Sequence, residues 1–141
     1  MSLKDIPVRI DLAGDGDPAG MAQALLREIA DHLRTVAAGG ERQIVGLATL
    51  PLSDADRTFL KETLGRGEVE ARISAAGTSE VYETAYPGVW WVTYMTEGGQ
   101  SVAEQLEIGT VPMILEAHLD DIRHSAERFP QLFEDRQRNH Q

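Results

Sequence analysis

Apolar residues recur every three or four positions in two early segments of the chain, which predicts two amphipathic helices. The first helix is expected over about residues 19–38, and the glycine pair at 39–40 ends it. Its predicted buried face consists of Met21, Leu25, Leu26, Ile29, Leu33 and Val36. The second helix follows Ser53, which forms a capping-box pattern with Asp56 three residues later, and it closes at Gly65.

In the middle of the chain the apolar period changes to two, which is typical of half-exposed strands. Residues 69–73 show this alternation, and turn-forming residues then separate further strands predicted around 80–84, over 89–96 and over 101–110. A strand at 43–50, between the two helices, adds to this set. Because consecutive strands joined by short turns pair antiparallel, we expect one antiparallel sheet.

A third helix is expected to begin at Pro112, a position where a first-turn proline is tolerated, and to end at Pro130. Its predicted buried face consists of Ile114, Leu115, Leu119, Ile122, Ala126 and Phe129. The predicted class is α+β, with an antiparallel sheet of four to five strands and about three helices packed mainly on one face. We expect an N-terminal arm and linker at residues 1–18, containing a strand-like alternation, a single domain at 19–130 and a polar tail at 131–141.

The composition is that of an ordinary folded domain, with 141 residues, 42% hydrophobic and 26% charged. The sequence contains no cysteine, which excludes disulfides, thiolate metal sites, cysteine-ligated iron–sulfur clusters and cysteine nucleophiles. No apolar run approaches the roughly 20 residues that cross a bilayer. The first five residues lack the apolar core of a signal peptide, so we expect a cytoplasmic location.

The acid excess, a net charge of −10, is concentrated in one region. Between Arg72 and Arg123 there is no Lys or Arg, and the acids there are Glu80, Glu83, Glu97, Glu104, Glu107, Glu116, Asp120 and Asp121. We expect an anionic surface of about eight charges that repels nucleic acids and anionic lipids, so neither class of partner is predicted. Such a surface attracts a basic protein partner, although acidity also serves solubility alone.

The usual catalytic and metal-binding patterns are missing from the sequence. The four histidines, at 32, 118, 124 and 140, lack the spacing of a two-histidine zinc site. No catalytic, cofactor-binding or metal-ligating residues are therefore predicted. A small hydrolase using carboxylates such as Glu80, Glu83 or Glu104 stands as an alternative. However, Glu80 and Glu83 are three apart on a strand and face opposite sides, which favours a simple acidic edge.

One segment, residues 83–92, differs from ordinary surface sequence because it contains adjacent tryptophans. These must point to opposite faces of a strand. If Trp91 lies in the core, Trp90 shares the other face with Val92 and Tyr94. An exposed Trp/Val/Tyr stripe would bind a protein partner, and a stripe covered by helices or by a second copy would be structural. The candidate partner-binding residues are Glu83, Tyr86, Pro87, Gly88, Trp90, Val92 and Tyr94.

Several blocks, taken in order, resemble the HupH/HyaF family of accessory proteins for the expression and formation of nickel–iron uptake hydrogenases. They are Leu50-Pro51-Leu52-Ser53 with Asp56, Leu64-Gly65-Arg66-Gly67-Glu68-Val69, Glu83-Thr84-Ala85-Tyr86-Pro87-Gly88-Val89-Trp90-Trp91-Val92, and Val111-Pro112. The resemblance runs from about Gln23 to Leu119. It implies a role in assembly of the hydrogenase, in particular of its iron–sulfur small subunit before export, together with other maturation proteins. Typical family members are about twice as long, with two related copies of this domain.

The resemblance and the missing cysteines together predict a chaperone or scaffold without a cofactor of its own. In this hypothesis Trp90 and Tyr94 contact apolar surface of the immature subunit, and the acids disfavour wrong partners. Trp90→Ala would then weaken binding and leave the fold intact, whereas Trp91→Ala would destabilise the fold. A homodimer that uses the stripe as its own interface is the alternative from another class.

Overall fold

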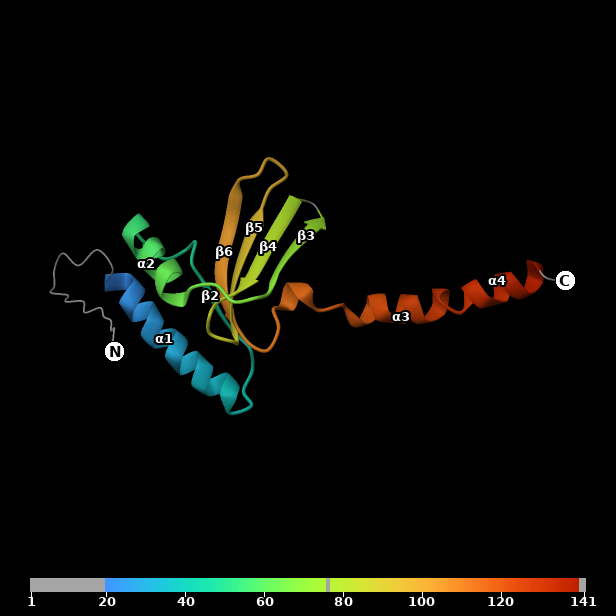
Figure 1. Ribbon diagram of the computed structural model, residues 1–141, viewed down its shortest axis with the longest axis horizontal. Coiled ribbons are helices and arrows are strands. Elements are labelled where there is room, and N and C mark those ends of the chain that lie inside the picture. The colour runs from blue at the N-terminus through green and yellow to red at the C-terminus, as the bar shows by residue number, and fades with distance from the viewer. Residues whose placement is uncertain (1–19, 76, 140–141) are drawn as a thin grey trace. The chain divides into compact units, whose positions relative to one another are not determined.

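The computed structural model describes residues 20–75 and 77–139 (Figure 1). The strand-like alternation expected within residues 1–18 lies outside the described residues. The described chain divides into two compact units, one that ends at Thr110 and one that begins at Val111. Since this division falls inside the predicted 19–130 domain, each unit is described by itself.

The first unit opens with two helices whose starts are tied together. Helix α1 spans Gly20–Ala37, and helix α2 spans Asp54–Leu64 after its N-cap Ser53. The predicted capping box is confirmed: the Asp56 amide donates to the Ser53 hydroxyl, and the Ser53 amide donates to the Asp56 carboxylate, both at 3.0 Å. The same buried carboxylate accepts a hydrogen bond from the Ala22 amide at 3.2 Å. Asp56 therefore caps α2 and joins it to the first turn of α1.

Five antiparallel strands form the sheet. They are β2 (Gln43–Gly46), β3 (Glu70–Ala75), β4 (Gly77–Glu83), β5 (Val89–Met95) and β6 (Ser101–Ile108). The spatial order is β2-β6-β5-β4-β3, so the shortest strand, β2, lies at one edge and β3 at the other. The predicted α+β class with an antiparallel sheet of up to five strands is confirmed.

The main core lies between the sheet and the two helices, which flank it on one side in Figure 1. Ala22, Leu25 and Ile29 of α1 and Leu60 and Leu64 of α2 pack with strand residues Val45, Val89, Trp91, Leu106 and Ile108 and with Leu47. Strand alternation sends Trp91 into this core. The predicted core position of Trp91 beside Val89 is therefore confirmed.

The second unit differs from its predicted form. A short 3₁₀ turn, η1 (Met113–Leu115), stands where the third helix was expected to begin, and α3 spans Leu119–Arg128. The tail forms a further helix, α4 (Gln131–Asn139). Leu119, Ile122 and Phe129, predicted to be buried, are 51–61% exposed. Helical spacing showed correctly that this segment is amphipathic, but spacing carries no information on whether a second surface covers the apolar side.

Candidate interaction surface

The two longest sequence blocks meet in space. The loop at residues 64–69 and the turn at 83–89 are joined by backbone hydrogen bonds from Gly67 to Glu83 (2.7 Å), from Glu83 to Val69 (2.8 Å) and from Ala85 to Leu64 (2.9 Å). A side chain at position 67 would collide with the neighbouring turn, because a Cβ there would lie 2.5 Å from the Thr84 carbonyl oxygen. Glycine is thus required at this position. We call residues 64–69 and 83–89 the motif junction.

Hydrogen bonds within the turn of the motif junction hold its backbone. The buried Thr84 hydroxyl lies 3.2 Å from both the amide and the carbonyl of Tyr86, and it accepts from the first and donates to the second. The Val89 amide donates to the same carbonyl at 3.0 Å. Gly88 adopts φ +98°, a left-handed conformation that favours glycine, and its carbonyl accepts from the Gly109 amide at 2.9 Å.

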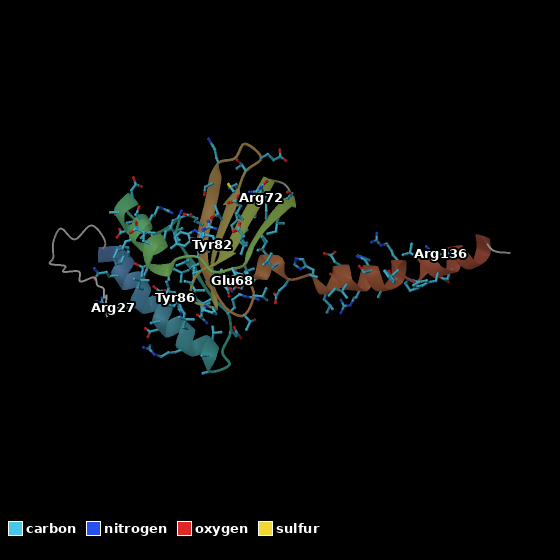
Figure 2. All side chains as sticks on the ribbon, in the orientation of Figure 1. Arg27, Glu68, Arg72, Tyr82, Tyr86 and Arg136 are labelled. Atoms are coloured by element: carbon cyan, nitrogen blue, oxygen red, sulfur yellow. The ribbon has the colours of Figure 1, made fainter. Side chains whose placement is uncertain are left out.

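This turn presents an aromatic side chain to solvent. Tyr86 is 53% exposed, and Pro87 beside it is exposed as well. Figure 2 shows Tyr86 and Glu68, from the two blocks of the motif junction, at the same end of the sheet. Glu83 and Gly88 of the turn are partly exposed. The candidate residues Glu83, Tyr86, Pro87 and Gly88 thus lie in one turn, and each is at least partly accessible.

The stripe along β5 is different, because its centre is buried. Trp90 is 5% exposed and Val92 is fully buried, although both point away from the core that holds Trp91. The indole N–H of Trp90 donates to the Gly109 carbonyl at 3.1 Å. Of the two alternatives for the Trp/Val/Tyr stripe, solvent-exposed or covered, these two residues fit the covered one. Tyr94 remains partly exposed.

The expected surface of eight free acids is also wrong, because arginines from earlier in the chain neutralise three of them. The pairs are Arg42–Glu107, Arg57–Glu104 and Arg72–Glu80. Glu107 is 1% exposed, and its carboxylate lies 2.9 Å from Arg42 Nε. Glu104 also accepts a 3.0 Å hydrogen bond from the Trp91 indole. Counting charges along the sequence missed these pairs, because strand pairing and the packing of α2 on the sheet bring segments that are distant in sequence together.

Two cations flank a pair of stacked aromatic rings on the helix-facing side of the sheet, and we call these four residues, Lys61, Trp91, Tyr82 and Arg66, the aromatic ladder. The Arg66 guanidinium lies 3.8 Å from the Tyr82 ring centre, and Lys61 Nζ lies 5.3 Å from that of Trp91. The two rings are stacked nearly parallel, with centroids 6.2 Å apart. Burial raises the pKa of Tyr82, Arg66 counteracts this, and Glu104 adds to it. Sequence reasoning missed Arg66 and Tyr82, although Arg66 lies inside one of the recognised blocks.

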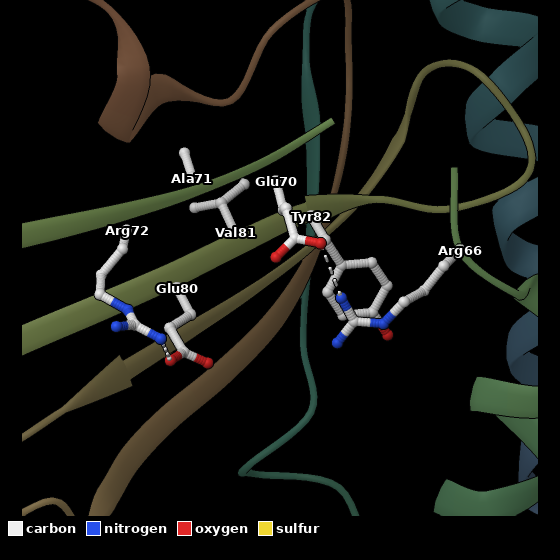
Figure 3. Close-up of a pocket in the computed structure, with 7 residues that line it drawn as sticks. All are labelled: Arg66, Glu70, Ala71, Arg72, Glu80, Val81 and Tyr82. Atoms are coloured by element: carbon white, nitrogen blue, oxygen red, sulfur yellow. Dashed lines mark hydrogen bonds and ion pairs between the residues drawn. The ribbon is translucent and has the colours of Figure 1, made fainter. Parts of the chain in front are cut away.

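A shallow pocket of about 310 Å³ lies beside this ladder, at the β3–β4 edge (Figure 3). Its carboxylates are held by arginines: Glu80 lies 3.3 Å from Arg72, and Glu70 lies 3.8 Å from Arg66. Glu83 faces the other side of the sheet, where it is the cross-strand neighbour of Trp90. The three acids of the hydrolase alternative therefore do not converge, since Glu80 and Glu104 are each paired with a separate arginine.

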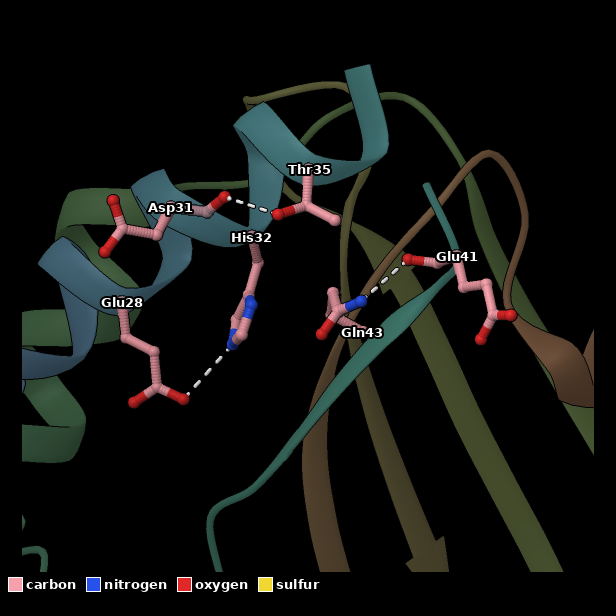
Figure 4. A network of polar contacts seen from close by, with 6 residues as sticks. All are labelled: Glu28, Asp31, His32, Thr35, Glu41 and Gln43. Carbon is pink, nitrogen blue, oxygen red and sulfur yellow. Dashed lines mark hydrogen bonds and ion pairs between the residues drawn. The ribbon is translucent and has the colours of Figure 1, made fainter. Parts of the chain in front are cut away.

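Within the described residues, no group of three or more His, Asp or Glu side chains could hold a metal ion. Figure 4 shows the surroundings of His32 on α1, where its Nε2 lies 3.1 Å from a Glu28 oxygen one helical turn away. This is a local surface contact. Among the helices of the described chain, none is long and apolar enough to span a membrane.

The model of one protein family, the C-terminal conserved region of the HupH hydrogenase expression protein, matches residues 20–135. The chain belongs to this family. The match includes both blocks of the motif junction.

Named relatives agree with this assignment. The chain is 32% identical over 123 residues to the hydrogenase expression/formation protein HoxQ of Cupriavidus necator, covering 87% of this chain and 44% of that protein. It is 37% identical over 90 residues to HoxQ of Azotobacter vinelandii, covering 64% of this chain and 32% of that protein. The chain thus spans about a third to a half of the length of these relatives. The solved structure of the hydrogenase expression protein HupH from Thiobacillus denitrificans superimposes with a TM-score of 0.77 at 34% identity, over 82% of this chain and 97% of that one.

Proposed function

We propose that this protein is an accessory factor for the maturation of a nickel–iron uptake hydrogenase, and that it binds the iron–sulfur small subunit as a non-catalytic chaperone or scaffold in the cytoplasm. The observation that carries the proposal is the family match over residues 20–135, whose named relatives are hydrogenase expression/formation proteins. Other maturation proteins are the further partners in this proposal.

The motif junction is the proposed contact surface. Tyr86 is its anchor, because an exposed aromatic side chain on a hydrogen-bonded turn loses little conformational freedom on binding, and the exposed ring of Pro87 lies beside it. Glu83 and Gly88 flank them and remain partly exposed. Tyr94, near the other end of β5, is also partly exposed. In this proposal Trp90 and Val92 support the surface from within, since they are buried.

The proposed mechanism is contact alone. The sequence has no cysteine, so the chain has no thiolate with which to receive or donate an iron–sulfur cluster. The carboxylates of the β3–β4 edge and of β6 are paired with arginines, which is consistent with a structural role. The protein would hold the small subunit in an assembly-competent state, and the cluster chemistry would take place on the subunit.

A capture experiment tests the partner. The tagged chain is mixed with separately produced small and large subunits of the hydrogenase from the same organism, and an unrelated acidic protein of similar size serves as control. We expect selective capture of the small subunit. If the tagged chain and the acidic control protein recover equal amounts of the small subunit, the small-subunit proposal is wrong.

A pair of variants tests the surface. Tyr86→Ala removes the exposed anchor, and we expect at least about a ten-fold weaker Kd, as for a hot-spot aromatic. Ile44→Ala is the matched control, because Ile44 is 48% exposed on β2, at the far edge of the sheet from β3. If both variants bind like the wild type, the motif junction is not the contact surface, whatever the capture experiment shows.

A further inference from the structure

The β3 edge of the sheet is suited to pairing with a further strand. β3 has six residues in unbroken register with β4 and contains neither Pro nor Lys, whereas the other edge strand, β2, has only four residues. Helices α1 and α2 lie toward the β6 side of the sheet and do not cover β3 (Figure 1). Natural proteins commonly shorten an edge strand or give it Lys, Pro or a bulge, because its backbone can pair with another chain. β3 has none of these protections.

The pairing with β4 determines which backbone groups of β3 point to the free edge. The Glu83 amide donates to the Val69 carbonyl at 2.8 Å, so Val69 and Glu83 form a hydrogen-bonded pair. Such pairs recur at every second residue of an antiparallel ladder, so Ala71 directs its N–H and C=O toward β4. Glu70 and Arg72 therefore direct theirs away from it. From the residues that the structure describes, no backbone hydrogen bond reaches these outward groups.

The side chains along this edge form a charged face and an apolar face. Glu70 is the cross-strand neighbour of Tyr82, so Glu70 and Arg72 both lie on the helix-facing side. Figure 3 shows these two side chains on one side of the β3 ribbon and Ala71 on the other. By the same alternation, the apolar face has the side chains of Val69, Ala71 and Ile73. Both charged residues are exposed, and Val69 is 44% exposed.

From this arrangement we infer that β3 pairs antiparallel with β3 of a second copy of the chain, about a two-fold axis that passes through the sheet at Ala71. Such an axis reverses the strand direction and keeps each face on its own side. Glu70 of each copy then forms a hydrogen-bonded pair with Arg72 of the other, so opposite charges lie directly across the interface twice. The two Ala71 residues meet at the close, non-hydrogen-bonded position, which suits a small side chain. Val69 meets Ile73 of the other copy on the apolar face.

The charges of the edge favour this register and this partner. Centring the pair on Glu70 would place acid against acid, and centring it on Arg72 would place base against base. Within one chain, Arg72 lies 3.3 Å from Glu80, and Glu70 lies 3.8 Å from Arg66. The joined edges thus carry Glu80 and Arg72 of one copy beside Glu70 and Arg66 of the other, with alternating sign. An edge whose charge pattern is its own complement fits a second copy, and this inference is independent of the proposed hydrogenase partner.

Sedimentation velocity of the full chain over about 1 to 200 μM tests the inference, because an edge contact buries little surface and its association should be weak. Glu70→Arg and Arg72→Glu should each raise the dimer Kd roughly ten-fold, since an attractive contact that occurs twice becomes repulsive. An equimolar mixture of the two variants restores opposite charges at both contacts. Its Kd should return to within about three-fold of the wild type, although each variant keeps its altered contacts within the chain.

Arg34→Glu is the matched control for Arg72→Glu. It makes the same change of charge and also breaks an exposed ion pair, with Asp31, but it lies on α1. Its dimer Kd should stay near that of the wild type. Mixing it with Glu70→Arg, which reproduces the net charges of the test mixture, should add no dimer beyond what Arg34→Glu forms alone. Far-UV circular dichroism verifies the fold of every variant.

Amide hydrogen exchange identifies the edge itself. The amides of Glu70 and Arg72 should become protected as the wild-type concentration rises, whereas the Ala71 amide should be protected throughout by its bond to β4. A wild-type chain that stays monomeric at the highest concentration overturns the inference. A mixture that stays dissociated, or a dimer that leaves the two edge amides unprotected, also overturns it. Protection that arises only when the hydrogenase small subunit is added would assign the edge to an extended client segment instead.

Discussion

Trp90→Ala distinguishes a structural residue from a contact residue in the recognised sequence block. The Trp90 side chain is 5% exposed, and its indole N–H donates a 3.1 Å hydrogen bond to the Gly109 carbonyl. Removing a buried tryptophan side chain costs about 3–5 kcal/mol of unfolding free energy, a value that includes the cavity left behind. Because domains of this kind are stable by about 5–15 kcal/mol, the variant should lose a large fraction of its stability.

Urea unfolding followed by far-UV circular dichroism measures this loss, because it does not depend on tryptophan fluorescence. Trp90→Phe keeps most of the ring and removes the indole N–H, and it should cost about 1 kcal/mol for the lost hydrogen bond, plus a smaller packing loss. Tyr86→Ala is the exposed comparison from the same sequence block, and it should change stability by no more than about 0.5 kcal/mol.

The reasoning fails if Trp90→Ala unfolds within about 1 kcal/mol of the wild type, since a buried aromatic side chain cannot be deleted so cheaply. That result, combined with lost small-subunit binding, would return Trp90 to the exposed contact role that the sequence pattern suggested. A destabilised Trp90→Ala beside a stable Tyr86→Ala would support the division of roles drawn from the structure.

Two further substitutions test the motif junction and the aromatic ladder. Gly67→Ala should lower the unfolding free energy by about 1–3 kcal/mol in the same urea assay, because its Cβ would lie 2.5 Å from the Thr84 carbonyl oxygen. Gly98→Ala, whose Cβ would have no atom nearer than 3.8 Å, is the control and should be neutral. Equal losses in the two variants would contradict the close approach at Gly67. Burial raises the pKa of Tyr82 above its ordinary value of 10.0, so its contribution to stability is complete below pH 10 and is lost as the pH rises through the raised folded-state pKa. Tyr82→Phe should therefore flatten the fall of unfolding free energy above about pH 10, and an unchanged slope would contradict this assignment.

Local patterns in the sequence predicted the first unit well. The helix capping at Ser53, the alternation of β5 and the position of Trp91 in the core all depend on interactions between near neighbours or on strand geometry. These features are encoded within a few residues, so they can be predicted without knowledge of the rest of the chain.

The errors concern surfaces, which depend on what lies nearby in space. Whether Trp90 is exposed or covered was left open, since alternation assigns a face of the sheet but not the cover over that face, and the side chain is buried. The acids were expected to be free, because the arginines that pair with them lie far away in sequence, as Arg57 and Glu104 do. Leu119 was expected to be buried and is 59% exposed, because helical spacing shows an apolar side of a helix but not what covers it. In the candidate site, the sequence indicated the exposed turn at Tyr86, and the structure added its connection to residues 64–69.

The central claim is that this family member works by binding an immature hydrogenase subunit. Its most direct test is a calorimetric titration of the purified chain into the small subunit lacking its clusters, with the large subunit titrated in parallel. We predict saturable binding to the small subunit at least about 100-fold tighter than to the large subunit, a difference of about 2.7 kcal/mol. Equal affinity for both subunits, or no heat of binding with the small subunit, would contradict the claim.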